Sequence, residues 1–238
     1  VNRDGKPDLV VASGGNEFYG EDYHNSPRVY LNDGKGILTR LPNAFQNIFS
    51  TASCVTATDI NGDGYPDLFI GGRVVPWAYG QVPQSYLLLN NRNGTFTDVT
   101  AQYANELRYA GMVTSAQWHD LDKDGDKDLL LSLQWDGFVA FINNRGRFAK
   151  KWLSEKRGWW NFLLPCDVNG DGHTDLIGGN LGLNSRLKAS AKEPVRLYFN
   201  DFDGNGKKEQ VLTYYVGGKE LPFASKAELE KQMPVLKK

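Results

Sequence analysis

One short acidic loop occurs five times along the chain, and its recurrence restricts the fold more than any other feature. The copies lie at residues 2–8, 59–67, 120–128, 167–175 and 201–209. In the complete copies, side chains that carry oxygen stand at loop positions one, three, five and nine, and position six is glycine. Glycine there permits the positive φ that a sharp turn needs. Five copies in one register indicate a repeated structural unit.

The side chains of this loop suit calcium, which takes about six to eight oxygen ligands. Short Asp and Asn side chains at alternate positions can point at one centre, and position seven can add a backbone carbonyl. We therefore predict about four structural Ca²⁺ sites. The predicted ligands are Asn2, Asp4 and Asp8; Asp59, Asn61, Asp63, Tyr65 and Asp67; Asp120, Asp122, Asp124, Asp126 and Asp128; Asp167, Asn169, Asp171, His173 and Asp175; Asp201, Asp203, Asn205, Lys207 and Glu209.

The five copies differ in how complete they are. The second and fourth are best formed, and the third carries five acids and should also bind. The last ends in Glu209, whose longer side chain predicts weaker binding. The first lacks position one, so we expect the chain to begin inside a motif of a longer protein, and the occupancy of this loop is left open. Magnesium is disfavoured because it prefers a tight octahedron that keeps several waters.

Two other interpretations of the loops were weighed. Asp, Asn and Gly favour turns even without an ion, and a single copy would not exclude that interpretation. An EF-hand needs a carboxylate at position twelve and a following helix, but that position is occupied by Ile70, Leu131, Gly178 or Leu212. Short apolar runs that end in Gly or Ser follow position nine, at residues 68–72, 129–132 and 176–179. These runs are typical of buried strands.

A second signature accompanies each acidic loop. An apolar strand runs into an Asn- or Gly-containing hairpin at residues 29–34, 86–91 and 139–144, and outgoing strands follow the last two at 95–99 and 147–149. One unit therefore consists of a strand, the acidic loop, a strand, a connection, a strand, a hairpin and a strand. Four antiparallel strands per repeat predict an all-β fold, the β-propeller.

The predicted propeller blades occupy residues 1–220, with the first repeat truncated. Whether the last acidic loop belongs to the fourth blade or opens a fifth is left open. A capping box at Ser225 and Glu228 predicts a short helix through about Gln232, which Pro234 ends. Residues 221–238 are accordingly predicted to form a C-terminal helical extension that continues into further chain.

The composition excludes several classes of function. The formal net charge of −1 gives no case for binding nucleic acid, and the sequence predicts no direct membrane insertion. Four bound calcium ions would raise the formal charge to about +7. Cys54 and Cys166 lie in different repeats, so we interpret them as small buried hydrophobic residues rather than as a disulfide.

The loop pattern, followed by an apolar strand, resembles the FG-GAP/VCBS repeats of integrin α-subunit propellers and of many bacterial surface proteins. Residues 180–185, 201–209 and 221–225 resemble a narrower group, the bacterial VCBS-repeat proteins that often carry an ASPIC/UnbV domain and are related to cartilage acidic protein. The resemblance implies a propeller of about seven blades, with calcium in its loops, exported to the cell surface or the bacterial outer membrane. Because about four blades are present, the remainder of the polypeptide or a partner chain would complete it.

Two functions follow from these observations. The first is a calcium-binding extracellular or cell-surface propeller that acts as a scaffold or binds a protein or a glycan. Aromatic platforms for a glycan would come from Trp77, Trp135, Trp159 and Trp160, although propeller blades also bury tryptophans. The alternative is a carbohydrate-active enzyme, a polysaccharide lyase or glycosidase, which needs a base or paired carboxylates outside the loops. The candidates for that chemistry, none of which we assign as catalytic, are His24, His119, Glu17, Glu21, Asp22 and Asp136.

Overall fold

The structure is a computed structural model that describes residues 1–182 and 184–237. Leu183, which falls in the run that carries the narrower resemblance, and Lys238, at the end of the predicted C-terminal extension, lie outside the described residues. The chain divides into two compact units. The first comprises residues 1–76 and 82–180, and the second comprises residues 77–81 and 181–238.

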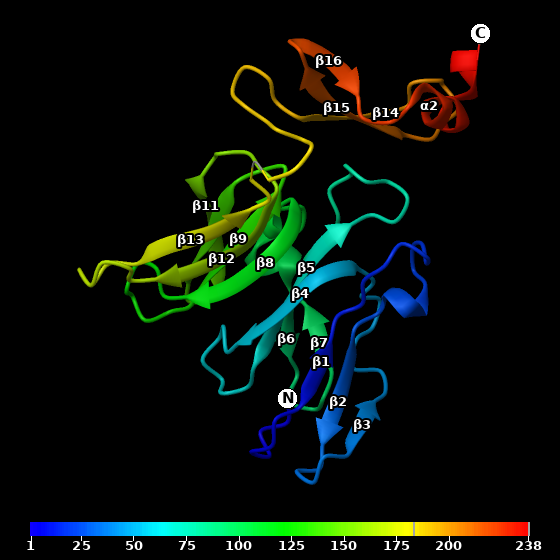
Figure 1. Cartoon of the computed structure of the whole chain (residues 1–238). Helices are drawn as coiled ribbons and strands as arrows, with labels where there is room; N and C mark the ends of the chain where they lie inside the picture. The colour runs from blue at the N-terminus through cyan, green and yellow to red at the C-terminus, as the bar shows by residue number, and fades with distance from the viewer. Residues whose placement is uncertain (183, 238) are drawn as a thin grey trace. The chain divides into compact units, whose positions relative to one another are not determined.

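Antiparallel sheets follow one another along the first unit, and in each sheet the strands are neighbours in chain order (Figure 1). The strands are β1 (Leu9–Val11), β2 (Arg28–Asn32) and β3 (Leu38–Leu41); β4 (Thr51–Thr58), β5 (Asp67–Val74), β6 (Tyr86–Asn90) and β7 (Phe96–Asp98); β8 (Met112–His119), β9 (Asp128–Gln134), β10 (Phe138–Asn144) and β11 (Arg147–Ser154); and β12 (Trp160–Cys166) and β13 (Asp175–Asn180). The predicted hairpins are confirmed in the first three sheets, and the predicted outgoing strands are confirmed in the second and third as β7 and β11.

The acidic loops have one place in this pattern. They join β4 to β5, β8 to β9, and β12 to β13, and the first loop leads directly into β1. In both four-stranded sheets the loop therefore precedes the second strand. Judged by the position of their loops, β1–β3 correspond to the second to fourth strands of such a sheet, and β12–β13 correspond to the first two.

The middle strands of the sheets are buried on both faces, which explains their continuous apolar runs. Leu68 and Ile70 of β5 pack in one core with Val29 of β2, whereas Phe69 packs in a second core with Leu129 of β9. Successive side chains of a strand point to opposite faces, so one strand supplies two cores. The second sheet is thus packed between the first and the third.

The third and fourth sheets repeat this packing. Strand β8 lies against β4 and β5, and β12 lies against β8 and β9. A third core joins Leu130 and Phe138 to Leu163 of β12. Consecutive four-stranded sheets with their first strands side by side are propeller blades. The fold is therefore all-β, as predicted, and its sheets are those of a propeller fragment.

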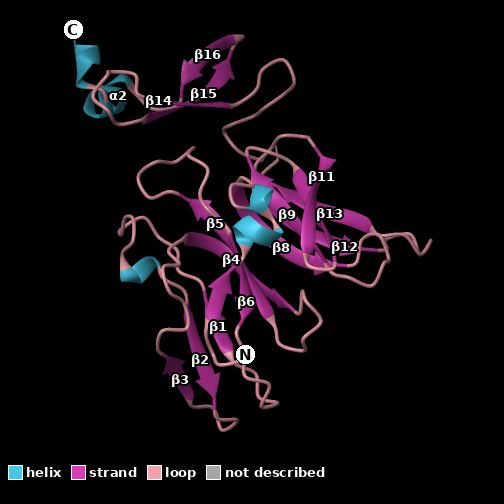
Figure 2. Cartoon of the chain, turned by 180° about the vertical axis from the view of Figure 1, so that it is seen from behind, coloured by secondary structure: helices cyan, strands magenta, loops and turns pink. Residues whose placement is uncertain are grey.

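Helices occupy only short segments in both units (Figure 2). A connection that the sequence did not predict as helical holds α1 (Thr100–Tyr103) and η2 (Asn105–Leu107), and it inserts the fully buried Leu107 into the core between the second and third sheets. A further turn, η1 (Tyr23–Asn25), precedes β2. Among the described residues, no helix has the length and apolar character needed to cross a membrane.

The second unit contains a sheet of its own, with β14 (Arg196–Asn200), β15 (Glu209–Val216) and β16 (Lys219–Pro222). The last acidic loop joins β14 to β15, so it does not belong to the β12–β13 sheet. The predicted helix is confirmed as α2 (Lys226–Gln232), and η3 (Pro234–Lys237) follows it. Ser225 forms the predicted capping box, in which its backbone N–H donates to the Glu228 carboxylate at 2.7 Å. The boundary at residue 220, which falls inside β16, stays a prediction.

Both cysteines are free thiols and only partly buried. Cys54 packs against the core between the second and third sheets, and burial raises the pKa of its thiol. The prediction that they do not pair agrees with these free thiols.

Candidate metal centres

A ladder of short hydrogen bonds runs through each acidic loop. In the second loop the Asp63 N–H donates to Asn61 Oδ1 at 3.0 Å, and the Tyr65 N–H donates to Asp63 Oδ1 at 2.8 Å. The third, fourth and fifth loops repeat both bonds at the same positions. These are the local turns that Asp and Asn side chains favour. They set the oxygens of positions three and five along one side of the loop.

In the four complete loops, the carboxylate at position one accepts a hydrogen bond from the backbone N–H of the glycine at position six. The Asp59 carboxylate accepts hydrogen bonds from the N–H groups of Asp63 at 3.1 Å and Gly64 at 2.6 Å. The equivalent acids, Asp167 and Asp201, accept from Gly172 at 2.8 Å and Gly206 at 2.9 Å. All five position-six glycines have positive φ, between 80° and 99°. That conformation is strained for a residue with a Cβ, which explains why glycine stands there in every copy.

Position nine anchors the loop to the blade. Asp67 is fully buried; its Oδ2 accepts from the Ile60 N–H at 3.0 Å and its Oδ1 from the Asn90 N–H at 2.8 Å. Asn90 ends β6, the third strand of the blade, and its Nδ2 donates to the Pro66 carbonyl at 3.2 Å. One carboxylate therefore joins the start of the loop to the end of a strand 23 residues further along the chain.

The same link recurs in the first and third sheets. Asp128 Oδ1 accepts from the Asn143 N–H at 2.8 Å, and Asp8 Oδ1 accepts from the Asn32 N–H at 3.0 Å. In the first loop the Val1 nitrogen lies 2.7 Å from Asp8 Oδ2, at the position where the other loops place a backbone N–H. The sequence alone predicts the three asparagines only as hairpin residues. Their place at the end of the third strand in each unit was the signal available; the three are Asn32, Asn90 and Asn143.

The carboxylates come closest together in the third and fifth loops. Asp120, Asp122 and Asp124 each offer an oxygen within 4.8 Å of the others, and Asp201, Asp203 and Glu209 do the same. Asp120 Oδ1 is buried and, among the described residues, has no hydrogen-bond partner. A buried charged oxygen without a partner is costly, and a cation at the cluster would satisfy it. The donors are all oxygens, which suits calcium or magnesium rather than a softer metal.

The remaining loops differ in how their acids are engaged. In the second and fourth loops, the position-one carboxylates accept several backbone hydrogen bonds. A carboxylate has about four acceptor sites, so both oxygens of Asp59 and the Oδ2 of Asp167 keep a lone pair for an ion, whereas Asp167 Oδ1 already accepts two hydrogen bonds. Glu209 is buried like Asp67 and accepts from the Phe202 N–H at 2.9 Å, so its longer side chain still reaches the start of its loop.

Burial, and then the closeness of the other carboxylates of the loop, raise the pKa of the acid at position nine, as in Asp67 and Asp128. Burial raises the pKa of Asp67, and the nearby carboxylates of Asp63 and Asp59 raise it further. Burial likewise raises the pKa of Asp128, with Asp122 and Asp124 adding to the effect. A divalent cation in the loop would reverse this balance, since it favours the ionised carboxylate.

Two arginine side chains, Arg3 and Arg92, lie beside the second loop. Arg92 donates to Asp63 Oδ2 at 3.0 Å from its Nη2, and both Arg92 and Arg3 lie over the Tyr65 ring, at 5.7 Å and 5.1 Å. Hydrogen bonds from the Tyr65 N–H and from Arg92 lower the pKa of Asp63. Arg3 belongs to the first loop, so the first and second loops touch through Tyr65.

The third and fourth loops also meet. Lys123 Nζ donates to the Gly172 carbonyl at 2.6 Å, and His119 Nε2 lies 2.9 Å from the Thr174 hydroxyl. Neighbouring loops thus lie at the same end of successive blades. The contact explains His119 as a residue that joins a strand end to the next loop.

Three of the residues considered for an enzyme, His24, Asp22 and Asp136, have partners close to them in the chain or in the fold. His24 Nδ1 lies 2.7 Å from Asp22 Oδ1, which also caps η1 by accepting from the His24 N–H at 2.9 Å. The His24 ring stacks 3.8 Å from Phe18 and 3.8 Å from Tyr23. Asp136 is 3.8 Å from Arg157, at the long end for an ion pair. Asp22 and His24 therefore have structural roles: Asp22 caps η1 and holds the His24 ring, which packs between two aromatic side chains.

The predicted aromatic platforms are divided between the units. Trp135 and Trp159 meet edge to face at 5.0 Å, and Trp160 packs on Phe138 with ring centres 4.5 Å apart, as a core residue would. Trp77 belongs to the second unit and is largely exposed.

Comparison with known proteins agrees with this architecture. The family model described as FG-GAP-like repeat matches residues 1–70 and 120–178, more than half of the chain and four of its five acidic loops. The chain belongs to the FG-GAP-like repeat family. The integrin alpha-V of Gallus gallus is 25% identical over 173 residues, which cover 60% of this chain and 16% of that protein. This FG-GAP-like chain therefore spans about a sixth of the length of that curated relative.

A solved structure also resembles the FG-GAP-like chain weakly. It is that of an Agrocybe aegerita lectin that recognises non-reducing terminal N-acetylglucosamine, with a TM-score of 0.44 and 17% identity over 90% of this chain and 60% of that one. A likeness at this level carries no functional argument. The narrower resemblance to the ASPIC/UnbV group stays a prediction.

Proposed function

We propose that this chain is a calcium-stabilised propeller module, exposed outside the cell or on its surface, that binds a protein or a glycan. The observation that carries the calcium part is the buried, unpartnered Asp120 Oδ1 beside the carboxylates of Asp122 and Asp124. Membership of the FG-GAP-like repeat family and the similarity to an integrin α-subunit support a binding module outside the cell. Attachment to a bacterial outer membrane is a narrower form of the same proposal.

The residues of the third loop fit a calcium ion. Asp120, Asp122, Asp124 and Asp128 would supply carboxylate oxygens, and Asp126 its backbone carbonyl. The equivalent positions would hold the ion in the other loops, for about four ions in all. A bound ion supplies positive charge to a cluster of carboxylates.

The protein's own part is to place that charge where it stabilises the blade. The second to fifth loops each join two neighbouring strands. In β4–β7 and β8–β11 the position-nine acid is tied both to the start of the loop and to the third strand. An ion that binds only the folded loop would stabilise it by mass action. Rigid blades would then present their connections as a binding surface, where binding residues are often found.

Thermal unfolding with calcium and with excess EGTA tests the proposal. Calcium at a hundredfold excess over Kd stabilises a single site by about 2.7 kcal/mol, which for a chain of this size shifts Tm by about 5–10 °C. The double variant Asp122→Asn/Asp124→Asn should lose part of the shift. The matched control is Glu155→Gln, an exposed acid outside the loops whose side chain makes no hydrogen bond among the described residues; it should keep the whole shift. Equal Tm values with calcium and EGTA would remove the calcium part of the proposal.

A further inference from the structure

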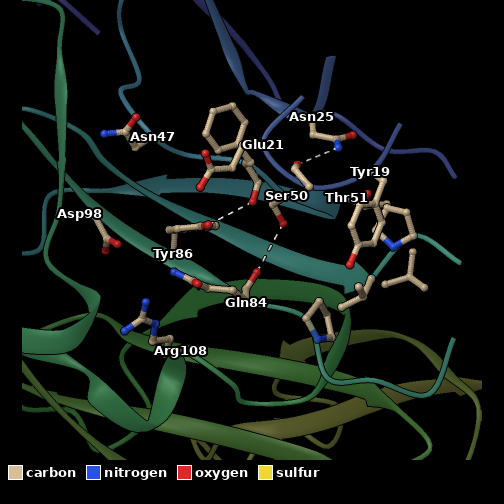
Figure 3. Close-up of a pocket in the computed structure, with 16 residues that line it drawn as sticks. Tyr19, Glu21, Asn25, Asn47, Ser50, Thr51, Gln84, Tyr86, Asp98 and Arg108 are labelled. Carbon is tan, nitrogen blue, oxygen red and sulfur yellow. Dashed lines mark hydrogen bonds between the residues drawn. The ribbon is translucent and has the colours of Figure 1, made fainter. Parts of the chain in front are cut away.

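A polar pocket of about 450 Å³ lies in the first unit, at the end of the second sheet away from the acidic loops (Figure 3). Strand β4 runs from Thr51 towards the loop at Asp59, so Thr51 marks the opposite end. The pocket is lined there by the starts of β4 and β6 and the ends of β5 and β7, and by the connections before β2, β4 and β8. Its volume is in the range of about 300–1,000 Å³ that is usual for small-molecule sites.

The walls of the pocket are held by hydrogen bonds. The buried Asn25 donates from Nδ2 to the carbonyls of Phe18 and Gly20, both at 3.3 Å, and its own carbonyl accepts from the Ser50 N–H at 3.0 Å. The Tyr86 hydroxyl donates to the Phe49 carbonyl at 3.0 Å. These bonds tie the connections before β2 and β4 to each other and to β6. The walls of the pocket are therefore held in place by the protein's own hydrogen bonds.

Several polar side chains of the lining have unused hydrogen-bonding capacity. Within the described residues, the side chains of Glu21, Asn47, Gln84 and Arg108 form no hydrogen bond or ion pair, and the Arg108 guanidinium contacts only the Tyr109 ring, at 5.7 Å. The Thr51 hydroxyl is buried and has no partner among the same residues. Figure 3 shows Glu21 and Arg108 on opposite sides of Gln84 and Tyr86.

This arrangement of charge selects among ligands. An anion would meet the carboxylates of Glu21 and Asp98, and a cation would meet the Arg108 guanidinium. An apolar ligand would displace water from these groups and leave them unpaired, at about 1–3 kcal/mol each. A ligand hydroxyl both donates and accepts, so a ligand with several hydroxyl groups can donate to Glu21 through one and accept from Arg108 through another, while the amide of Gln84 can do either.

The rest of the lining is apolar and suits the other face of such a ligand. Val74, Val75, Pro76 and Pro83 contribute no side-chain hydrogen bonds, and the Phe49 ring adds an aromatic edge. A sugar ring combines hydroxyl groups at its rim with C–H groups on its faces, so it can contact both kinds of surface at once.

We propose that this pocket binds the ring of a neutral sugar through Glu21, Gln84 and Arg108. The inference rests on the proposed function, because it names the ligand class and the site of that binding module. It uses none of the tryptophans considered from the sequence.

The test titrates the full chain, saturated with calcium, with the methyl glycosides of glucose, galactose, mannose and N-acetylglucosamine, and with glycylglycine as a zwitterionic probe. Binding is measured by ligand-observed NMR. At least one glycoside should bind saturably, and Glu21→Gln and Arg108→Ala should each weaken its Kd at least tenfold. The matched control is Glu106→Gln, an exposed acid two residues from Arg108 that does not line the pocket; it should leave Kd unchanged.

Three results would overturn the inference: no glycoside binds, both variants bind as the wild type does, or glycylglycine alone binds and is lost in the variants. Glu21 and Arg108 are both exposed, so both variants should fold, and the unfolding temperature of each sample checks this. The same samples separate the two proposals. A calcium-dependent Tm without glycoside binding removes only the pocket inference, whereas glycoside binding without a calcium effect removes only the calcium part of the proposed function.

Discussion

The Asp67 carboxylate accepts a hydrogen bond from the backbone N–H of Asn90 at 2.8 Å, and the Asn90 side chain donates in return to the Pro66 carbonyl at 3.2 Å. The last acid of a loop and the last residue of a strand thereby form one unit. The pairs Asp8 with Asn32 and Asp128 with Asn143 repeat it. In the second and third sheets the link is made from buried residues, Asp67 with Asn90 and Asp128 with Asn143, so it stabilises the blade as well as shaping the loop.

Replacing Asn90 by alanine tests this link. The variant leaves the Pro66 and Val1 carbonyls and the Arg92 N–H without the partner that Asn90 supplies. A buried group left unpaired costs about 1–3 kcal/mol, so urea unfolding should show a loss in that range. The control is Asn105→Ala, at an exposed position whose side chain makes no hydrogen bond among the described residues, where a change within about 0.5 kcal/mol is expected. Equal losses in the two variants would contradict the role assigned to Asn90.

Replacing Asp120 by asparagine should have opposite effects in the two states of the loop. Without calcium, the variant removes one of three clustered carboxylates, and relief of repulsion should stabilise the chain by roughly 0.2–1 kcal/mol. With calcium, the variant lacks a charged ligand and should show a smaller Tm shift than the wild type. Unfolding in EGTA and in calcium measures both. The control Asp136→Asn lies outside the loops and should change neither quantity. If the Asp120 variant were less stable than the wild type in EGTA, repulsion among the three carboxylates would be contradicted.

Replacing Gly64 by alanine tests the turn at position six. Gly64 has φ +85°, and a Cβ there would also lie 2.7 Å from the Arg3 guanidinium. A residue with a Cβ in the left-handed region costs about 1–2 kcal/mol, and urea unfolding should show a loss of that size. Asparagine tolerates this region better, so Gly64→Asn should lose less. The decisive result is a larger loss of unfolding free energy in Gly64→Ala than in Gly64→Asn. A larger loss in Gly64→Asn would contradict the explanation.

We expect the stability of the second unit to depend on pH because of Glu220. A hydrogen bond from the Thr213 hydroxyl at 2.6 Å, followed by those from Arg196 at 2.6 Å and Tyr198 at 3.0 Å, lowers the pKa of Glu220 below its ordinary value of 4.5. A carboxyl with a lowered folded-state pKa stabilises the fold above its unfolded-state pKa, and this contribution is lost as pH falls through the folded-state value.

Glu220→Gln should therefore reduce stability at pH 7 and flatten the decline that the wild type shows below about pH 4.5. Urea unfolding between pH 3 and about pH 7 measures both effects. The control is Glu193→Gln, an exposed position in the same unit, which should follow the wild-type curve. A Glu220→Gln curve parallel to that of the wild type would show that Glu220 does not contribute in this way.

Much of the fold could be predicted because its signals are local. Alternate Asp and Asn residues with glycine at position six define the loops, and the apolar runs after Asp67 and Asp128 define the second strands. The capping box at Ser225 and Glu228 is contained in four residues. Each of these features depends on contacts between near neighbours, which the sequence displays directly.

The remaining features depend on contacts between distant residues. The link from Asp67 to Asn90 spans 23 residues, so Asn90 was interpreted only as part of a hairpin. The pocket brings together Glu21, Thr51 and Arg108 from separate connections, and no spacing in the sequence predicts that. The buried, unpartnered oxygen of Asp120 likewise depends on how its loop packs.

The most direct test of the central claim is the calcium content of the purified chain. The protein is stripped with EGTA, dialysed against a buffer with calcium at about 1 mM, within the range that extracellular sites require, and analysed for bound metal by mass spectrometry. The account predicts about four calcium ions per chain, and fewer in the Asp122→Asn/Asp124→Asn variant. A chain that binds no calcium under these conditions would contradict it, and the five loops would then be turns that hold the blades together without an ion.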